Sequence, residues 1–242
     1  MRSYYRSLIK NATIITDGLK LYLDAGNVSS YPATGSTWYD ISGNSNNATL
    51  VNGPTYESAN NGSIMLDGTD DWITVSSNGY GVFNTQDFTI DLWVKFNSFL
   101  PYSPLWSYDY INHSSQPYYA QHLRLSNNDS VYMAWNIAGS YVQQNISYTF
   151  TAGSWYNIVW TRKSNGDIYA YINSSQVLGI SSPGTISYYN QPVWLGRSNF
   201  TGFGYSPTPT SGNYANAKFY NRALTPAEVL FNYNVLKSRY GL

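Results

Sequence analysis

Apolar and polar residues alternate in short runs along most of this chain. Residues 19–24 carry leucine at every second position, and residues 88–96 carry Phe, Ile, Leu, Val and Phe in the same way. A period of two places the apolar side chains on one face of a β-strand. Further runs of this kind are SIMLDG, DWITVSS, HLRLS, SVYMAWNI, SYVQQNISYTF, WYNIVWTRKS, DIYAYINSSQV and PVWLGRS. Many short strands separated by turns, without the strand–helix rhythm of a parallel sheet, predict an all-β sandwich or barrel.

A helical pattern occurs near the C-terminus, at residues 225–239. Thr225 is a suitable N-cap, Pro226 fits the first helical position, and Glu228 stands at capping-box distance. Gly241 is expected to end the helix. We expect an apolar stripe of this helix to cover part of the sandwich, formed by Val229, Leu230, Tyr233 and Leu236.

The first 17 residues differ from the rest of the chain. Basic residues alternate there with aromatic and aliphatic ones, but the segment is too short to form a stable helix alone. We interpret residues 1–17 as an N-terminal arm that docks on another protein, and residues 18–242 as the globular domain. The residues expected to contact the partner are Arg2, Tyr4, Tyr5, Arg6, Leu8, Ile9 and Lys10.

Composition narrows the range of partners. The formal net charge is zero and 11% of the residues are charged, so no basic field attracts nucleic acid or an anionic membrane. The chain has no cysteine, which favours folding in a reducing cytosol. The N-terminus lacks an apolar run of signal-peptide length, and no window is long enough to span a membrane. We therefore expect neither nucleic acid nor a membrane as a partner.

The carboxylates argue against hydrolysis of polysaccharides. A retaining glycosidase needs two carboxyl groups about 5–5.5 Å apart. The chain has two glutamates, Glu57 in a polar loop and Glu228 at the start of the helix. Asp87 and Asp91 share one strand face but lie about 13 Å apart along it, and we interpret both as solvated.

Other catalytic groups are equally sparse. Asp70 and Asp71 would point to opposite faces of an extended chain. His113 and His122 lack the accompanying residues of a polysaccharide lyase. Without cysteine, thiol catalysis is excluded. We therefore expect a protein that is not an enzyme.

The loop WYDISGNSNNATLVNGP has two interpretations. Carboxylate and amide oxygens are ligands that Ca²⁺ prefers, and a structural Ca²⁺ would be held by Asp24, Asp40, Asn44 and Asn47, with Asn46 nearby. Alternatively, Asp40 and the asparagines bind the backbone of a turn and accept left-handed geometry. The second interpretation is the simpler one, because the loop lacks the bidentate glutamate of an EF-hand.

Aromatic residues in loop-rich stretches are the candidates for ligand binding. Sugars are recognised by exposed aromatic faces with polar groups at their edges. The candidates are Trp106, Tyr108, Tyr110, Tyr118, Tyr119, Phe203 and Tyr205. The same side chains would suit a protein–protein contact equally well. Trp93, Trp135 and Trp160 lie in strand patterns instead, and we expect them in the core or on a sheet surface.

Several segments together resemble a laminin G-like, concanavalin A-like domain of the kind found in structural proteins of tailed bacteriophages. They are DGLKLYLDAGN, WYDISGNSNNATL, IMLDGTDDWITV, FTIDLWVKF, WYNIVWTRKSNGDIYAYIN and AKFYNRALTPAEVLFNYNVLKSRYG. The resemblance covers residues 17–242. It implies a jelly-roll sandwich of two antiparallel sheets, with one C-terminal helix and the N-terminal arm outside the shared pattern. It also implies carbohydrate or surface binding, and a Ca²⁺ at the edge of the sandwich.

The function expected from these observations is that of a non-enzymatic virion protein on the outer surface of a tailed phage. It would be a capsid decoration, fibre or tail component, made in the host cytoplasm and held by its arm to other virion proteins. In that setting we expect a homo-oligomer that also binds glycans. A free carbohydrate-binding lectin module is the alternative, and a polysaccharide hydrolase or lyase fits less well.

Overall fold

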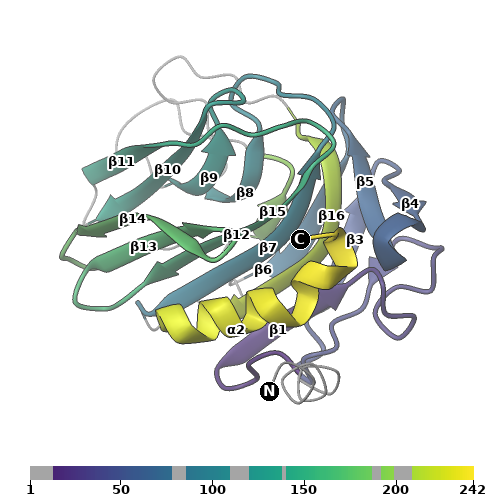
Figure 1. Ribbon diagram of the computed structural model, residues 1–242, viewed down its shortest axis with the longest axis horizontal. Helices are drawn as coiled ribbons and strands as arrows, with labels where there is room; N and C mark the ends of the chain where they lie inside the picture. The colour runs from purple at the N-terminus through teal and green to yellow at the C-terminus, as the bar shows by residue number, and fades with distance from the viewer. Residues whose placement is uncertain (1–12, 78–85, 110–119, 138–139, 187–191, 199–208) are drawn as a thin grey trace.

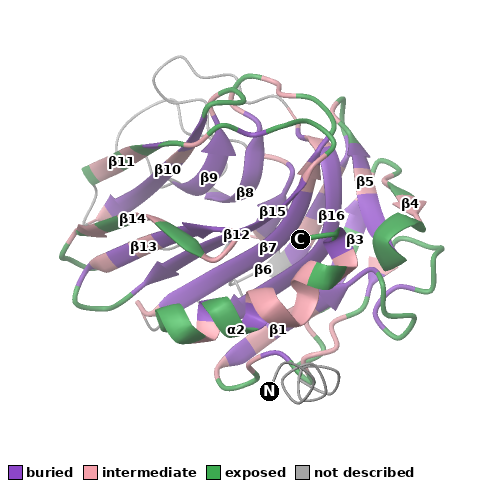
Figure 2. Ribbon diagram, in the orientation of Figure 1, coloured by how far each residue is buried: buried purple, intermediate pink, exposed green. Residues whose placement is uncertain are grey.

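The protein is a sandwich of two antiparallel β-sheets with a helix on one outer face (Figure 1). The computed structural model describes residues 13–77, 86–109, 120–137, 140–186, 192–198 and 209–242. Residues facing between the sheets are buried, and exposed residues gather in the turns and on the outer side of the helix (Figure 2). The predicted jelly-roll sandwich with one C-terminal helix is confirmed. No helix among these residues is both long and apolar enough to cross a bilayer.

The first sheet, sheet A, contains eight strands. In spatial order these are β14 (Ser175–Ser181), β13 (Asp167–Ile172), β12 (Trp155–Arg162), β7 (Phe88–Phe96), β16 (Ser211–Tyr220), β5 (Ser63–Asp67) and β4 (Thr55–Glu57), with β1 (Leu19–Asp24) also paired to β16. The central strand β7 shows the predicted alternation, because every second residue from Phe88 to Phe96 joins the core. A short 3-10 turn, η1 (Ala59–Asn61), connects β4 to β5.

The second sheet, sheet B, also has eight strands. Their order is β11 (Ser140–Ser147), β10 (Ser130–Ile137), β9 (Ala120–Leu125), β8 (Pro104–Asp109), β15 (Pro192–Leu195), β6 (Trp72–Ser77), β3 (Ala48–Val51) and β2 (Thr37–Trp38). Between the sheets, the rings of Trp106 and Trp135 lie 5.1 and 6.0 Å from the ring of Trp160. Trp135 and Trp160, which were expected in the core or on a sheet surface, lie in the core.

Helix α2 (Pro226–Leu236) lies across the outer face of sheet A and continues into the 3-10 turn η5 (Lys237–Tyr240) (Figure 1). Its predicted capping box is present: the Thr225 side chain accepts from the Glu228 N–H, and the Glu228 carboxylate accepts from the Thr225 N–H. Gly241 follows in the left-handed conformation, with φ 75°. The predicted buried stripe is partly wrong. Leu230 is 47% exposed, and Asn232 faces the sheet with 1% exposure.

A polar layer separates α2 from sheet A. The Asn232 amide donates to the Tyr220 hydroxyl at 3.0 Å and to Asp91 Oδ2 at 3.4 Å. Asp91 also pairs with Lys218 at 3.1 Å and accepts from Asn157 at 2.7 Å. The prediction that Asp91 is solvated is therefore wrong, because the helix covers the outward face of β7 at this point.

The N-terminal segment begins to pack before the predicted domain boundary. Ile14 is buried in a cluster with Val229 of α2. The Ile15 N–H donates to the Asn232 side chain at 2.9 Å, and the Tyr220 hydroxyl donates to the Ile15 carbonyl at 3.0 Å. The packed domain thus includes Ile14, earlier than the expected start at residue 18. The predicted partner contacts from Arg2 to Lys10 lie outside the described residues.

Candidate functional site

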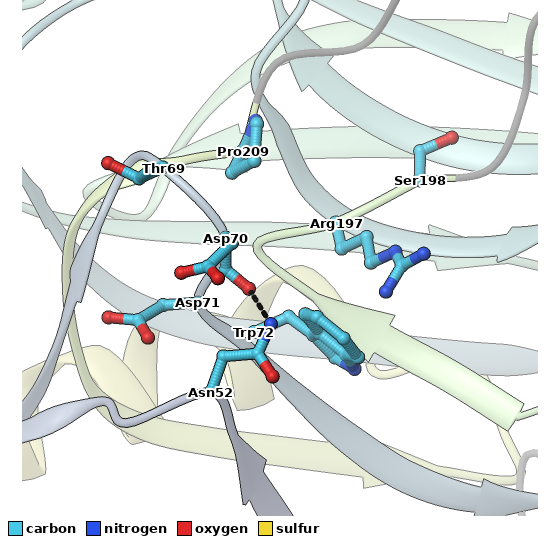
Figure 3. A pocket seen from close by; sticks show the side chains of 8 residues that line it. All are labelled: Asn52, Thr69, Asp70, Asp71, Trp72, Arg197, Ser198 and Pro209. Carbon is cyan, nitrogen blue, oxygen red and sulfur yellow. Dashed lines mark hydrogen bonds between the residues drawn. The ribbon is translucent and has the colours of Figure 1, made fainter.

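An open pocket of about 440 Å³ lies at one end of the sandwich, where chain segments from both sheets meet. It is bounded by the ends of β3, β5 and β15 and by the beginnings of β6 and β16. Its lining residues are Asn52, Thr69, Asp70, Asp71, Trp72, Arg197, Ser198 and Pro209 (Figure 3). Below we call this the Trp72 pocket. Its volume lies in the range of about 300–1,000 Å³ that is usual for small-molecule sites.

One wall of the pocket is the turn between β5 and β6, which is held by its own carboxylates. Asp67 Oδ1 accepts the N–H of Thr69 at 2.7 Å, and Asp71 Oδ2 accepts the N–H of Asp67 at 3.1 Å. Gly68 has φ 82° within the turn, a conformation that glycine adopts without strain. The Asn52 amide donates to the Asp70 carbonyl at 2.9 Å, which ties the turn to the end of β3 (Figure 3).

The opposite wall is positioned by the end of β15. Gly196 has φ 81°, and a Cβ there would come within 2.2 Å of Leu66 Cδ1, so this position needs glycine. The chain then leaves the sheet, and the Arg197 carbonyl accepts the Ser107 hydroxyl at 2.7 Å. This bond fixes the backbone from which the Arg197 side chain enters the pocket.

Trp72 and Arg197 form a stacked pair. The guanidinium carbon of Arg197 lies 4.0 Å from the centre of the Trp72 ring and 6.0 Å from that of Trp194. The indole N–H donates to Thr74 at 2.9 Å, which fixes the ring on β6. A cation over an indole is attracted by the ring quadrupole. The stack therefore holds a partly exposed aromatic surface and a set of N–H donors together at the pocket wall.

The acidic side of the pocket carries three aspartates. One carboxylate oxygen each of Asp67, Asp70 and Asp71 lies within 4.8 Å of the other two. The backbone N–H of Thr69 lowers the pKa of Asp67, whereas burial raises the pKa of Asp71. In the described part of the chain, the Asp70 carboxylate takes part in no hydrogen bond or ion pair. Asp70 is also exposed.

Acid and base face each other here without pairing. Asp70 and Arg197 lie on opposite sides of the pocket (Figure 3). Among the described residues, no carboxylate forms an ion pair with Arg197. A ligand between them meets hydrogen-bond acceptors on one side and donors on the other, beside an aromatic ring. This arrangement suits a compact molecule that has several hydroxyl groups and an apolar face.

The acidic cluster does not by itself form a metal centre. Ca²⁺ takes about 6–8 oxygen ligands, and the three carboxylate oxygens that lie close together supply three of them. The oxygens of Asp67 and Asp71 named above already accept backbone N–H groups.

Among the described residues, none of the predicted aromatic ligand residues lines this pocket. Trp106 and Tyr108 belong to the buried core, with exposures of 0% and 5%, so these two assignments are wrong. A register shift between Pro104 and Trp106 changes the alternation at the start of β8, where Leu105 and Trp106 are both buried. The remaining candidates, Tyr110, Tyr118, Tyr119, Phe203 and Tyr205, lie outside the described residues.

The loop around Asp40 is a turn in which protein groups occupy the carboxylate. Asp40 Oδ1 accepts the N–H groups of Tyr22 and Ser42, both at 2.8 Å. Oδ2 accepts the Ser42 hydroxyl at 2.8 Å and the Asn46 N–H at 2.9 Å. Asn47 Oδ1 accepts the Asp40 N–H at 2.9 Å. These bonds match the turn interpretation of the sequence.

Two more of the four predicted Ca²⁺ ligands, Asp24 and Asn44, form bonds to other protein groups. Asp24 Oδ1 pairs with the Arg239 guanidinium at 2.5 Å and accepts the Gly26 N–H at 2.9 Å. The Asn44 amide donates to the Leu19 carbonyl at 3.1 Å. The Arg239 guanidinium therefore neutralises the Asp24 carboxylate, and the Asn44 side chain forms a hydrogen bond with the backbone at the start of β1.

The groups considered for catalysis are engaged elsewhere. Glu57 pairs with Lys95 at 3.4 Å, and Glu228 pairs with Arg222 at 2.7 Å. His122 is buried, with its Nε2 3.5 Å from the Tyr141 hydroxyl, and His113 lies outside the described residues. Among the described residues, the three aspartates of the pocket turn are the one cluster of three or more such side chains whose ligand atoms lie within 4.8 Å of one another.

Trp72 and Arg197 were not among the site residues predicted from the sequence. The sequence signal was present in the runs DDW and GRS at strand ends, where a strand leaves the sheet and side chains reach the rim. Nothing in either run alone shows that β6 and β15 are neighbours. That pairing, with Leu195 opposite Ile73, brings the two residues together.

Comparison with known proteins agrees with the architecture. The family model Laminin_G_3, described as the concanavalin A-like lectin/glucanases superfamily, matches residues 67–230, more than half of the chain. The chain belongs to this superfamily. None of the curated proteins matches it.

Solved structures share the fold at low sequence identity. Domain 4 of AbnA, a GH43 extracellular arabinanase from Geobacillus stearothermophilus solved with arabinotriose, is 16% identical with TM-score 0.64, over 90% of this chain and 98% of that one. A second structure is that of botulinum neurotoxin type C, a toxin whose cell entry depends on two ganglioside molecules. It is 15% identical with TM-score 0.68, over 92% of this chain. The binding domain of Paraclostridial Mosquitocidal Protein 1 is 19% identical with TM-score 0.64, over 90% of this chain. This chain spans 52% of each of the two toxin chains.

Proposed function

We propose that this protein binds carbohydrate in the Trp72 pocket and does not hydrolyse it. The observation that carries the proposal is the stacked Trp72–Arg197 pair, which faces Asp70 across one pocket; the Asp70 carboxylate pairs with no described residue. Sugars combine apolar C–H faces with hydroxyl groups that both donate and accept hydrogen bonds. An indole beside a guanidinium and a carboxylate offers a complementary contact for each of these features.

The structural relatives support a binding role. One is domain 4 of an arabinanase in complex with arabinotriose, and another is a toxin whose cell entry depends on two ganglioside molecules. Superfamily membership is compatible with both lectins and glucanases. Fold likeness alone does not carry function, so the proposal depends on the pocket itself.

The geometry of the aspartates favours binding over turnover. A glycosidase places its two carboxyl groups on either side of the scissile bond, and one of them has a raised pKa. Asp67, Asp70 and Asp71 come instead from a single tight turn, on one wall of the pocket. Asp71, whose pKa is raised by burial, has one carboxylate oxygen bonded to the Asp67 N–H.

The proposed setting is the outer surface of a tailed-phage particle, where the arm would attach the domain to other virion proteins. This part of the proposal depends on the sequence resemblance and on the basic and aromatic residues before Asn11. Removing residues 2–12 is expected to abolish incorporation into particles while the domain stays folded. Particles that incorporate the truncated protein at the normal level would contradict the anchoring role.

Binding is tested by calorimetric titration of the purified protein with a panel of oligosaccharides. For each sugar that binds, Trp72→Ala is expected to weaken affinity by about tenfold or more, because aromatic anchors carry much of the binding energy in such sites. The matched control is Tyr39→Ala, which removes a 45% exposed aromatic that does not line the pocket. Unchanged affinity in Trp72→Ala would contradict the proposed site.

Turnover is tested separately by incubating the protein with the same sugars and measuring new reducing ends. We expect no release above the blank. Release that disappears in Asp71→Asn would show that the aspartate turn is catalytic and would overturn the non-enzymatic part of the proposal. Binding with no release supports both parts.

A further inference from the structure

We propose that the Trp72 pocket selects neutral glycans and rejects their acidic counterparts. This inference rests on the proposed function and names the class of ligand that the same pocket accepts. It follows from the charges that the fold gathers at the pocket, and from which of these charges are already satisfied.

The pocket carries more negative than positive charge. Asp70, Asp71 and Arg197 line it, and a carboxylate oxygen of Asp67 lies within 4.8 Å of the carboxylates of the other two aspartates. The formal balance is therefore three negative charges against one positive charge. Lys is absent from the described residues that line the pocket.

Arg197 is the one cation among the described lining residues, and its guanidinium also contacts an aromatic ring. Arg197 stacks on Trp72 at 4.0 Å, so one face of its guanidinium is covered by the indole. Its N–H groups remain suited to donate to a sugar hydroxyl or ring oxygen. An acidic sugar attracted to Arg197 would place its carboxylate in the same pocket as the exposed Asp70. Like charges brought together at a binding site cost affinity and exclude the wrong partner.

A neutral sugar meets no such penalty. Its hydroxyl groups can donate to the Asp70 carboxylate and accept from Arg197, and hydrogen bonds to charged groups are the stronger kind. Asp70 and Arg197 lie on opposite sides of the pocket (Figure 3). Two neighbouring hydroxyl groups of a sugar, or one hydroxyl group and the ring oxygen, would therefore bind both side chains at once. The pocket chemistry therefore favours ligands that carry donors and no negative charge.

The test compares related neutral and acidic sugars. Suitable pairs are lactose with 3′-sialyllactose, galactose oligomers with galacturonate oligomers, and glucose oligomers with glucuronate-containing ones. For each pair with a neutral member that binds, we expect the acidic member to bind at least about tenfold more weakly at low ionic strength. The ratio should shrink as NaCl is raised, because salt screens exposed charges over about 10 Å at 0.1 M.

Two variants test whether the charges of the pocket cause the selectivity. Asp70→Asn removes a charge whose side chain makes no hydrogen bond with a described residue, so the fold should be kept. It is expected to move the neutral-to-acidic ratio towards one. The control is Asp17→Asn, which also removes one carboxylate but lies beside Arg222, just past the far end of β16 from Pro209. That strand is roughly 30 Å long, so this variant should leave the ratio unchanged.

The outcomes separate this inference from the proposed function. Acidic members that bind as well as or better than neutral ones would overturn charge selection while leaving glycan binding intact. An equal change of ratio in Asp70→Asn and Asp17→Asn would show that net charge, not the pocket, is responsible, and would also overturn the inference. If no sugar of either class binds, the proposed function itself fails.

Discussion

The Lys218 ammonium lies 3.1 Å from Asp91 Oδ2 beneath helix α2, and the two side chains are 0% and 1% exposed. Burial lowers the pKa of Lys218, and the neighbouring Asp91 opposes that change. Asn157 and Asn232 donate to the two oxygens of Asp91, so the carboxylate is surrounded by partners from the sheet and the helix. This buried ion pair therefore links the helix to the sandwich.

Removing the positive partner should be costly. Lys218→Met leaves Asp91 as a buried charge without its counter-ion, and such changes typically cost about 3–5 kcal/mol of the free energy of unfolding. Urea unfolding followed by circular dichroism measures the loss. The exposed Lys163 provides the matched control, because Lys163→Met should change the free energy of unfolding by no more than about 0.5 kcal/mol. Equal effects of the two substitutions would show that the buried pair has no special role.

The contact between Arg222 and Glu228 at the start of α2 should make the free energy of unfolding depend on pH in the acid range. The hydrogen bonds from Arg222 to the Glu228 carboxylate lower the pKa of Glu228 from 4.5 to about 2. Because the folded pKa lies below the unfolded one, this stabilisation is fully present above about pH 4.5 and is lost as the pH falls through about 2. Glu228→Gln should therefore be less stable than the wild type at pH 7, with a difference that shrinks between pH 4.5 and 2. Denaturant titrations across this range measure it, and a difference that is independent of pH would contradict the assignment.

Two truncations should define where the folded domain begins. Removing residues 2–12 keeps Ile14 in its cluster with α2, and the melting temperature should stay close to that of the full chain. Removing residues 2–16 also removes the buried Ile14 and the hydrogen bond from the Ile15 N–H to Asn232. Burial of one isoleucine contributes about 1.5–3 kcal/mol, so this longer truncation should unfold at clearly lower temperature. Identical melting curves for both truncations would place the boundary after residue 16.

The Asp40 turn should be stable without a metal. Asp40→Ala removes an acceptor of four hydrogen bonds and should lower the free energy of unfolding by about 2 kcal/mol or more. Melting curves recorded with excess Ca²⁺ and with a chelator should superimpose, because a ligand that binds only the folded state raises the melting temperature. A rise with Ca²⁺ that disappears in Asp40→Ala would restore the metal interpretation of this loop.

Much of the fold could be predicted from local pattern. The alternation in residues 19–24 and 88–96 predicted β1 and β7, and it predicted correctly which of their residues face the apolar core. The capping box at Thr225 and Glu228 placed the start of α2. The pair Asn165-Gly166 is typical of a tight hairpin turn, and it lies between β12 and β13, where Gly166 has φ 98°. These features depend on residues close in sequence, which is why the sequence alone reveals them.

The remaining features depend on contacts between distant segments. Asp91 points away from the core of the sandwich, and it is buried because helix α2, which is distant in the sequence, packs over it. Trp106 was assigned to a loop-rich stretch of the sequence, yet the irregular start of β8 places its side chain in the core. Trp72 and Arg197 meet through the pairing of β6 with β15, which no local pattern encodes.

The central claim is that a sugar contacts Trp72, and the indole N–H resonances of the protein report on this directly. The Trp72 signal is assigned as the one that disappears in Trp72→Phe, and a neutral oligosaccharide that binds is then titrated into the uniformly ¹⁵N-labelled wild type. We expect the Trp72 indole signal to shift with saturation, while the signals of the core residues Trp38 and Trp135 stay in place, because those rings are fully buried. Saturable binding that leaves the Trp72 signal unmoved would contradict the assignment of the glycan site to this pocket.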